Sequence, residues 1–303
     1  MKILLTTALF QLLFQVLNAS PTTIMKAGFS LPDSLAEVTI RYKSMCNLIL
    51  LPVTINDTTH VNLILDTGCR NLVLFGRRFN KFFNMEPDKS IQFSGLGSGK
   101  PLAGRLSLGN KVSIDAVIGR KIPVVVVPNQ NLFGSYLNVD GVIGYDIFIK
   151  FEVELDLARQ RITFRPPFTS ELSSDYEKIN IRVEDSLPII NSTIFFQGSE
   201  GQSRDLIIDT GSSLGLLVKT SDLEKYPKET RGFVIGRGLN GDITGIEIMA
   251  EKILLDHFEI NTISAGVIYS GFRNNASIGM GILNDFTIVF NYCKEYVGLR
   301  RTA

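Results

Sequence analysis

The feature that most constrains this chain is an apolar run ending on Asp-Thr-Gly, which occurs twice. The first copy, residues 63–70, reads Leu-Ile-Leu-Asp-Thr-Gly-Cys-Arg, and the second, residues 206–213, reads Leu-Ile-Ile-Asp-Thr-Gly-Ser-Ser. Each run predicts a buried strand, and an Asp at the end of such a strand is costly unless something uses or neutralises it. One Asp-Thr-Gly is also an ordinary strand-to-turn sequence. Two copies, one in each half, indicate a paired-carboxylate site formed by Asp66 and Asp209.

Other landmarks repeat in the same order. Asp209 follows Asp66 by 143 positions, and a second Gly-rich stretch begins at Gly238, 143 positions after the first begins at Gly95. A period this long indicates duplicated domains, because solenoid repeats have periods of about 20–50 residues. The 303 residues also suit two domains of about 150 each. Apolar residues alternate with polar ones in both halves, which predicts β-strands and an all-β fold.

The expected division of the chain follows from these landmarks. We expect a signal peptide at 1–20, a flexible segment at 21–37, an N-terminal lobe at 38–168 and a C-terminal lobe at 169–303. An early Lys2, an apolar stretch and the small residues Ala19 and Ser20 are typical of a secretory signal. We therefore expect an exported protein, secreted or periplasmic, and an uncleaved N-terminal membrane anchor is the alternative.

Composition narrows the possible partners. With 31 basic and 30 acidic residues and no basic run, the chain shows no signature of nucleic-acid binding. Two histidines and the absence of a Cys-x-x-Cys motif argue against a structural zinc site, and we expect no metal and no cofactor. An odd number of cysteines leaves at least one thiol free. Whether Cys46 pairs with Cys293 stays open.

The two Asp-Thr-Gly motifs resemble those of the aspartic proteases, in both the pepsin-like and the retroviral-type branches, and the resemblance covers about residues 38–303. It implies two similar closed β-barrel-like lobes with the active site in the cleft between them. In that family a hydrophobic-hydrophobic-Gly element packs beside each motif. Residues 142–144 (Val-Ile-Gly) and 277–279 (Ser-Ile-Gly) look like these elements. Because the lobes are short, the chain looks closer to retroviral-type lobes fused in tandem than to pepsin.

The resemblance also implies a reaction. Two adjacent carboxylates cannot both ionise easily, so they share one proton. The ionised carboxylate acts as general base on a bound water, and the protonated one acts as general acid to the peptide carbonyl oxygen. We therefore expect a monomeric aspartic endopeptidase that cleaves a peptide or protein substrate.

Supporting residues are implied in the same way. Gly68 and Gly211 would allow the tight turn behind the carboxylates, and Thr67 and Thr210 would hydrogen-bond across the lobes. Ser212 follows the second Gly, where the family commonly has Ser or Ala. Two flaps are expected at 94–104 and 236–245, with four candidate substrate-binding glycines, Gly95, Gly97, Gly238 and Gly241.

The first motif departs from the family pattern, because it continues with Cys69 and Arg70. A thiol is a weaker hydrogen-bond donor than a hydroxyl, and an inward-pointing Arg70 would hold both carboxylates ionised. We expect Arg70 to point outward. This departure leaves open the alternative of a catalytically inactive peptide-binding protein on the same fold.

Two further motif matches point elsewhere. Residues 211–215 match G-x-S-x-G, which with Ser213 and His257 would suit a serine hydrolase, a further alternative that needs a helix after the motif. Residues 236–241 match G-x-G-x-x-G, and a dinucleotide site there would also need a following helix. The residues after 241 alternate between apolar and polar as a strand does, which disfavours cofactor binding at this G-x-G-x-x-G match.

Overall fold

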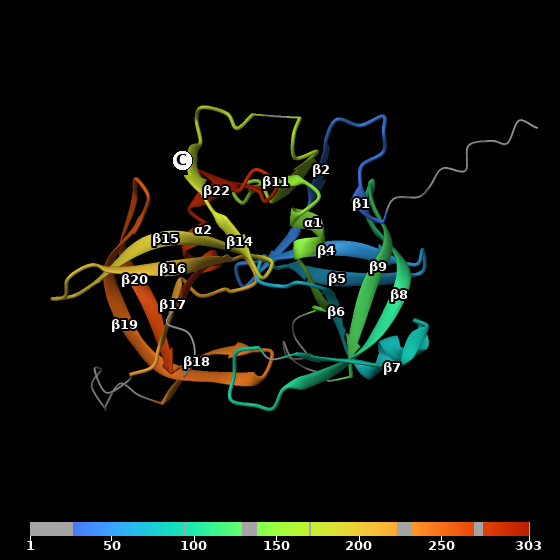
Figure 1. Cartoon of the computed structure of the whole chain (residues 1–303), viewed down its shortest axis with the longest axis horizontal. Helices are drawn as coiled ribbons and strands as arrows, with labels where there is room; N and C mark the ends of the chain where they lie inside the picture. Colours follow the sequence, from blue (N-terminus) through green and yellow to red (C-terminus); the bar gives the residue numbers. More distant parts are fainter. Residues whose placement is uncertain are drawn as a thin grey trace, which may run out of the picture.

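The computed structural model describes residues 27–93, 95–128, 138–169, 171–222, 232–269 and 275–302. The predicted signal peptide and residues 21–26 lie outside the described residues. Within the described ranges, no helix is both long and apolar enough to cross a bilayer. Two lobes lie side by side, with a further sheet across one side of the pair (Figure 1).

The N-terminal lobe is built on a closed ring of six strands. Around the ring each strand pairs with the next, and the pairing of β4 with β8 closes it. The strands in ring order are β4 (Leu48–Ile55), β5 (Thr59–Leu65), β10 (Gly141–Ile143), β6 (Leu72–Phe75), β9 (Val117–Val127) and β8 (Leu102–Ile114). Closure leaves no free edge in the ring. A further strand, β7 (Met85–Phe93), extends from β8.

The C-terminal lobe repeats this ring pairing for pairing. Antiparallel and parallel neighbours occur in the same places, and the pairing of β15 with β19 closes the ring. The ring order is β15 (Leu187–Phe196), β16 (Gln202–Asp209), β21 (Ala276–Gly279), β17 (Leu216–Thr220), β20 (Phe258–Tyr269) and β19 (Gly241–Leu255). Strand β18 (Phe233–Gly238) extends from β19 as β7 does from β8. The all-β fold of two similar closed β-barrel-like lobes is thus confirmed.

A six-stranded sheet joins the two halves. Its order is β13-β23-β22-β11-β12-β2, so each half supplies three adjacent strands. The strands are β2 (Val38–Arg41), β11 (Glu152–Asp156), β12 (Arg161–Arg165), β13 (Glu177–Asn180), β22 (Phe286–Asn291) and β23 (Tyr296–Arg301). At the centre, Glu152 lies opposite Asn291 and Asp156 lies opposite Thr287. An approximate twofold axis therefore passes between β11 and β22 and relates the lobes.

The strands that lead to the Asp-Thr-Gly motifs are buried in the core of their lobes. Leu63, Ile64 and Leu65 of β5 are at most 1% exposed, and β5 lies between β4 and β10 in the ring. Continuous apolar sequence is typical of strands covered on both faces. The aliphatic runs before Asp66 and Asp209 thus anchor each motif in the core of its lobe.

Shorter elements complete the fold. They are β1 (Gly28–Ser30), β3 (Lys43–Met45), β14 (Arg182–Glu184), the 3-10 helix η1 (Arg77–Lys81), α1 (Tyr145–Phe148) and α2 (Met280–Leu283). Strand β1 falls within the segment 21–37, where it pairs with β9 and buries Phe29. All three cysteines are free, so Cys46 and Cys293 are not paired.

Candidate active site

The two Asp-Thr-Gly loops are positioned by parallel strands. Strand β10 runs parallel to β5 with Ile143 opposite Leu65, and β21 runs parallel to β16 with Gly279 opposite Asp209. A Cβ at Gly144 would overlap the backbone oxygens of the first loop, and one at Gly279 would lie 2.6 Å from the Ser212 oxygen. Glycine is required at both positions because each element presses directly against its loop.

The carboxyl groups of Asp66 and Asp209 lie against each other where the lobes meet. They hydrogen-bond to one another. Each also accepts a bond from its own loop, Asp66 Oδ1 from the Gly68 N–H (2.7 Å) and Asp209 Oδ1 from the Gly211 N–H (3.0 Å). A Cβ at Gly68 would lie 3.3 Å from Asp209 Oδ1, and one at Gly211 would overlap the Asp66 carboxyl. These glycines let each carboxyl approach the opposite loop.

Thr67 and Thr210 link the loops beneath the carboxyls. The Thr67 N–H donates to Thr210 Oγ1 (3.0 Å) and the Thr210 N–H donates to Thr67 Oγ1 (2.9 Å). Each hydroxyl donates onward across the lobe boundary, Thr67 to the Ile208 oxygen (2.6 Å) and Thr210 to the Leu65 oxygen (2.8 Å). Both side chains are fully buried. The four bonds are reciprocal, so each lobe holds the other's loop in place.

Burial and mutual repulsion shift the titration of the pair upward. Desolvation, and next the charge of Asp209, raise the pKa of Asp66 well above its usual value. Desolvation also raises the pKa of Asp209, but the Gly211 N–H, the bond from Asp66 and the positive charge of Lys219 oppose that rise. The pair therefore favours a single shared proton, and the positive charge of Lys219 acts toward ionisation of Asp209.

The departures in the first loop are accommodated. The Cys69 thiol donates to the Asn71 backbone oxygen (3.0 Å), and burial, followed by the charge of Asp66, raises the pKa of Cys69. The thiol is therefore neutral. Arg70 is exposed and its Nη2 donates to the Asp185 backbone oxygen (3.1 Å). In the second loop the Ser212 N–H donates to the Asp209 backbone oxygen (3.3 Å).

The two flaps are hairpins whose tips meet, at the bottom of Figure 1. A Cβ at Gly95 would lie 2.6 Å from the Leu239 Cβ, and one at Gly238 would overlap the backbone of Leu96. Gly97 and Gly241 have positive φ angles, 126° and 95°, which favour glycine. Ser94 lies outside the described residues. The four flap glycines thus serve tip contact or tip conformation.

The other motif matches lack the structural context that they need. Ser213 is followed by strand β17, not by a helix, and His257 lies in the exposed turn between β19 and β20, near Glu177 and Asp256. Residues 236–241 span the tip of a flap hairpin, with the end of β18, a two-residue turn and the start of β19. In the described part of the chain, no group of three or more His, Cys, Asp or Glu side chains could hold a metal ion.

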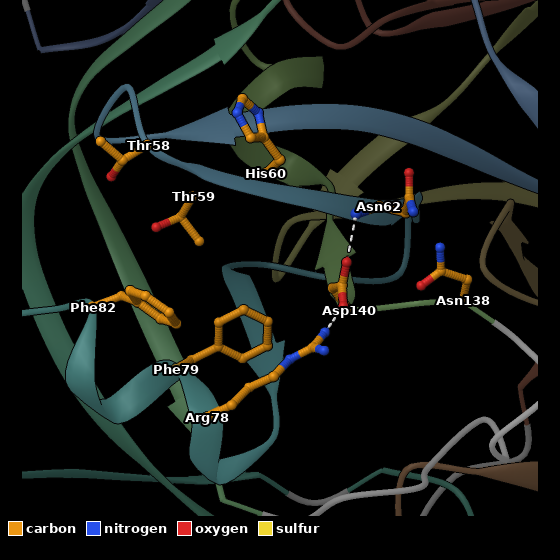
Figure 2. Close-up of a pocket in the computed structure, with 9 residues that line it drawn as sticks. All are labelled: Thr58, Thr59, His60, Asn62, Arg78, Phe79, Phe82, Asn138 and Asp140. Carbon is orange, nitrogen blue, oxygen red and sulfur yellow. Dashed lines mark hydrogen bonds and ion pairs between the residues drawn. The ribbon is translucent and has the colours of Figure 1, made fainter.

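A separate concavity lies on the N-terminal lobe, and Figure 2 shows its lining. At its centre the Asp140 carboxyl accepts a hydrogen bond from the Asn62 N–H (2.8 Å) and pairs with Arg78. Neither Asp-Thr-Gly loop contributes to the lining, which consists of Thr58, Thr59, His60, Asn62, Arg78, Phe79, Phe82, Asn138 and Asp140. The hydrogen-bonding capacity of the Asp140 carboxyl at the centre is thus used within the protein.

Sequence reasoning did not identify two residues near the site. Lys219 lies on β17 and its charge acts on Asp209, and Asn240 lies at the tip of the second flap. A lysine inside the apolar run Leu-Leu-Val-Lys-Thr was a usable signal for the first. The second stands where the repeat has Gly97, 143 positions earlier. Neither Lys219 nor Asn240 has an identical counterpart in the first half, so the repeated landmarks do not point to them.

Comparisons with known proteins agree with this fold. Residues 51–147 match the family model described as aspartyl protease. Among solved structures, the crystal structure of aspartic proteinase from Irpex lacteus superposes with a TM-score of 0.57 at 15% identity, covering 88% of this chain and 98% of that one. No curated protein matches in sequence. At this identity the structural likeness shows the fold.

Proposed function

We propose that this chain, which has the aspartic protease fold and a first lobe that matches the aspartyl protease family, is an endopeptidase with Asp66 and Asp209 as its catalytic dyad. The observation that carries the proposal is the contact between the two carboxyls, one from each lobe, above the reciprocal threonine bonds. Both halves of the dyad belong to one chain, which supports a monomer. The N-terminal sequence favours export.

In this mechanism Asp209 is the base and Asp66 the acid. The ionised carboxylate of Asp209 takes a proton from a water molecule bound between the two carboxyls, and that water attacks the peptide carbonyl carbon. Asp66 gives its proton to the carbonyl oxygen, which yields a neutral tetrahedral intermediate. The proton held by Asp209 then passes to the leaving nitrogen as the C–N bond breaks. The ionised Asp66 takes back a proton from one hydroxyl of the intermediate, which gives the carboxylic acid product and restores the shared proton. The neutral Cys69 thiol and the outward-pointing Arg70 are compatible with this shared proton.

Single substitutions at the dyad test the proposal. Asp66→Asn and Asp209→Asn are each expected to abolish turnover of a sensitive peptide, because an amide cannot exchange protons and each transfer contributes about 10²–10⁴-fold. The double variant should be little worse than either single one, since the pair acts as a unit. Ser213→Ala and His257→Ala serve as matched controls and should keep most activity. A folded Asp66→Asn protein that still cleaves near the parent rate would refute the dyad.

The same variants report on stability. Both carboxyls have folded-state pKa values above the ordinary value, so the fold is favoured while they are protonated and loses that contribution as pH rises through the folded pKa. At pH 7 each Asn variant should therefore unfold at an equal or higher denaturant concentration than the parent.

The remaining alternative is a peptide-binding protein without turnover on the same fold. The Cys69-Arg70 sequence favours it, because the family commonly has Ser or Ala at the first of these positions. A peptide library incubated with the parent protein from pH 3 to 7 separates the two functions. Binding of peptides without any cleavage across that range would support the silent binder and reject the enzyme.

A further inference from the structure

The two flap tips are joined by hydrogen bonds that centre on one residue. The Asn240 N–H donates to the Leu96 oxygen (3.0 Å), its backbone oxygen accepts from the Gly99 N–H (2.6 Å), and its Oδ1 accepts from the Gly95 N–H (3.1 Å). A fourth bond runs from the Ser98 N–H to the Asp242 oxygen (3.1 Å). Three of these four bonds use Asn240, which is only 6% exposed.

The tip contacts are unequal although the lobes are alike. By the repeat, Asn240 corresponds to Gly97, which has no side chain to bond across. Gly97 is instead the surface on which Asn240 rests, because a Cβ there would lie 2.6 Å from the Asn240 carbonyl carbon. One flap thus provides the side chain and the other provides the space for it.

Apolar contacts reinforce the join. Leu96 of the first flap packs against a cluster of the second lobe that contains Leu217, Ile243 and Ile268, and Leu239 of the second flap packs against the main core. Parting the tips would expose both leucines as well as the polar groups of Asn240. Apolar surface returned to water opposes that opening, so the closed arrangement is favoured without a ligand.

We propose that Asn240 is a latch that holds the two flap tips together when no peptide is bound. Opening the tips to admit a peptide then requires this side chain to release the Gly95 N–H together with the backbone bonds and leucine contacts. That the latch controls substrate access rests on the proposed protease function. The latch itself is a property of the flap tips and can be tested without turnover.

The test is amide hydrogen exchange at Gly95 and Gly99, measured by NMR in the Asp209→Asn background, so that activity plays no part. Asn240→Ala should speed exchange at both amides by about three- to tenfold, the range for loss of one hydrogen bond. Asn240→Asp keeps an acceptor oxygen and should restore slow exchange at Gly95. Ser98→Ala removes an exposed hydroxyl but no tip bond, and it should leave both amides as in the background protein.

A second variant keeps the proposal falsifiable if Asn240→Ala misfolds. Gly97→Ala would place a methyl group against the Asn240 carbonyl, so it should prevent closure and expose both amides more than Asn240→Ala does. If Gly95 and Gly99 exchange at the rate of an unstructured peptide before any substitution, the tips are not joined and the proposal fails. It also fails if Asn240→Ala leaves both rates unchanged.

Access is measured separately on the active protein with a fluorescent statine-containing peptide, a mimic of the tetrahedral intermediate. Asn240→Ala should raise both its association and its dissociation rate, because a weaker latch opens more often. Unchanged rates would reject the latch as a control on access. Absence of any statine binding together with normal flap exchange would count against the protease function and leave the latch intact.

Discussion

The two Asp-Thr-Gly loops make the same contacts at their centres and differ in the residues that follow. Both carry an Asp that bonds to its own Gly and a Thr that bonds to the other lobe. Beyond the glycine, the first loop has a buried neutral thiol and an exposed arginine, whereas the second has two serines. The comparison shows that the two halves are identical across Asp-Thr-Gly, and that their sequences diverge at the next residue, Cys69 in the first loop and Ser212 in the second.

A second difference lies on the strand after each loop. Leu74 of β6 lies opposite Gly141, and Val218 of β17 lies opposite the corresponding Ala276. The next residues are therefore equivalent, and they are Phe75 in the first lobe and Lys219 in the second. A cation on one side alone stabilises one carboxylate more than the other, which makes the dyad electrostatically unequal although its geometry is nearly symmetric.

The largest effect that tests the likeness of the lobes is expected at the threonines. Thr67→Val and Thr210→Val each remove a buried hydroxyl and leave an N–H and a carbonyl oxygen without a partner, which should cost about 2–5 kcal/mol of unfolding free energy. Because the bonds are reciprocal, the two variants should lose similar amounts, as measured by urea denaturation. A loss confined to one of them would show that the link is carried by one lobe.

A smaller effect tests the inequality of the carboxyls. Lys219→Met removes the cation that helps to stabilise the Asp209 carboxylate, so the pKa of Asp209 should rise. The acid limb of the kcat/KM profile should then move to higher pH, because a general base with a higher pKa becomes ionised only at a higher pH. Phe75→Leu is the control at the equivalent position of the first lobe. An acid limb that stays in place would mean that Lys219 does not act on the dyad.

The smallest effect is expected at Arg70. Its ion pair with Asp185 is exposed on both sides, 59% and 76% by side chain, and such pairs contribute about 0–1 kcal/mol. Arg70→Ala should change the free energy of unfolding by less than about 1 kcal/mol and should leave the pH profile of kcat/KM unchanged. A large change in the profile would show that Arg70 turns toward the carboxyls during catalysis, and the difference between the loops would then be functional.

Local pattern was sufficient to predict much of the fold. The aliphatic runs before Asp66 and Asp209, the alternating strands at 152–164 and the Gly-containing hairpins all follow from periodicity and turn chemistry.

Features that depend on pairing between distant segments were not predictable in this way. The ring closures, the meeting of β11 with β22 and the contact of Asn240 with Gly95 each join residues far apart in sequence. No single stretch encodes these features, because each depends on which distant segment becomes the neighbour. The effect of Lys219 on Asp209 likewise appears only when β17 is placed beside the second loop.

The shared six-stranded sheet creates a choice of partner during folding. Strands β11 and β22 are equivalent in the duplicated halves, so the edge that β11 offers to β22 resembles the edge that it would offer to β11 of another molecule. The short connection between β12 and β13 keeps the correct partner at an effective concentration in the millimolar range. Refolding of dilute protein should therefore yield monomers, whereas concentrated refolding mixtures favour exchange of whole lobes between chains.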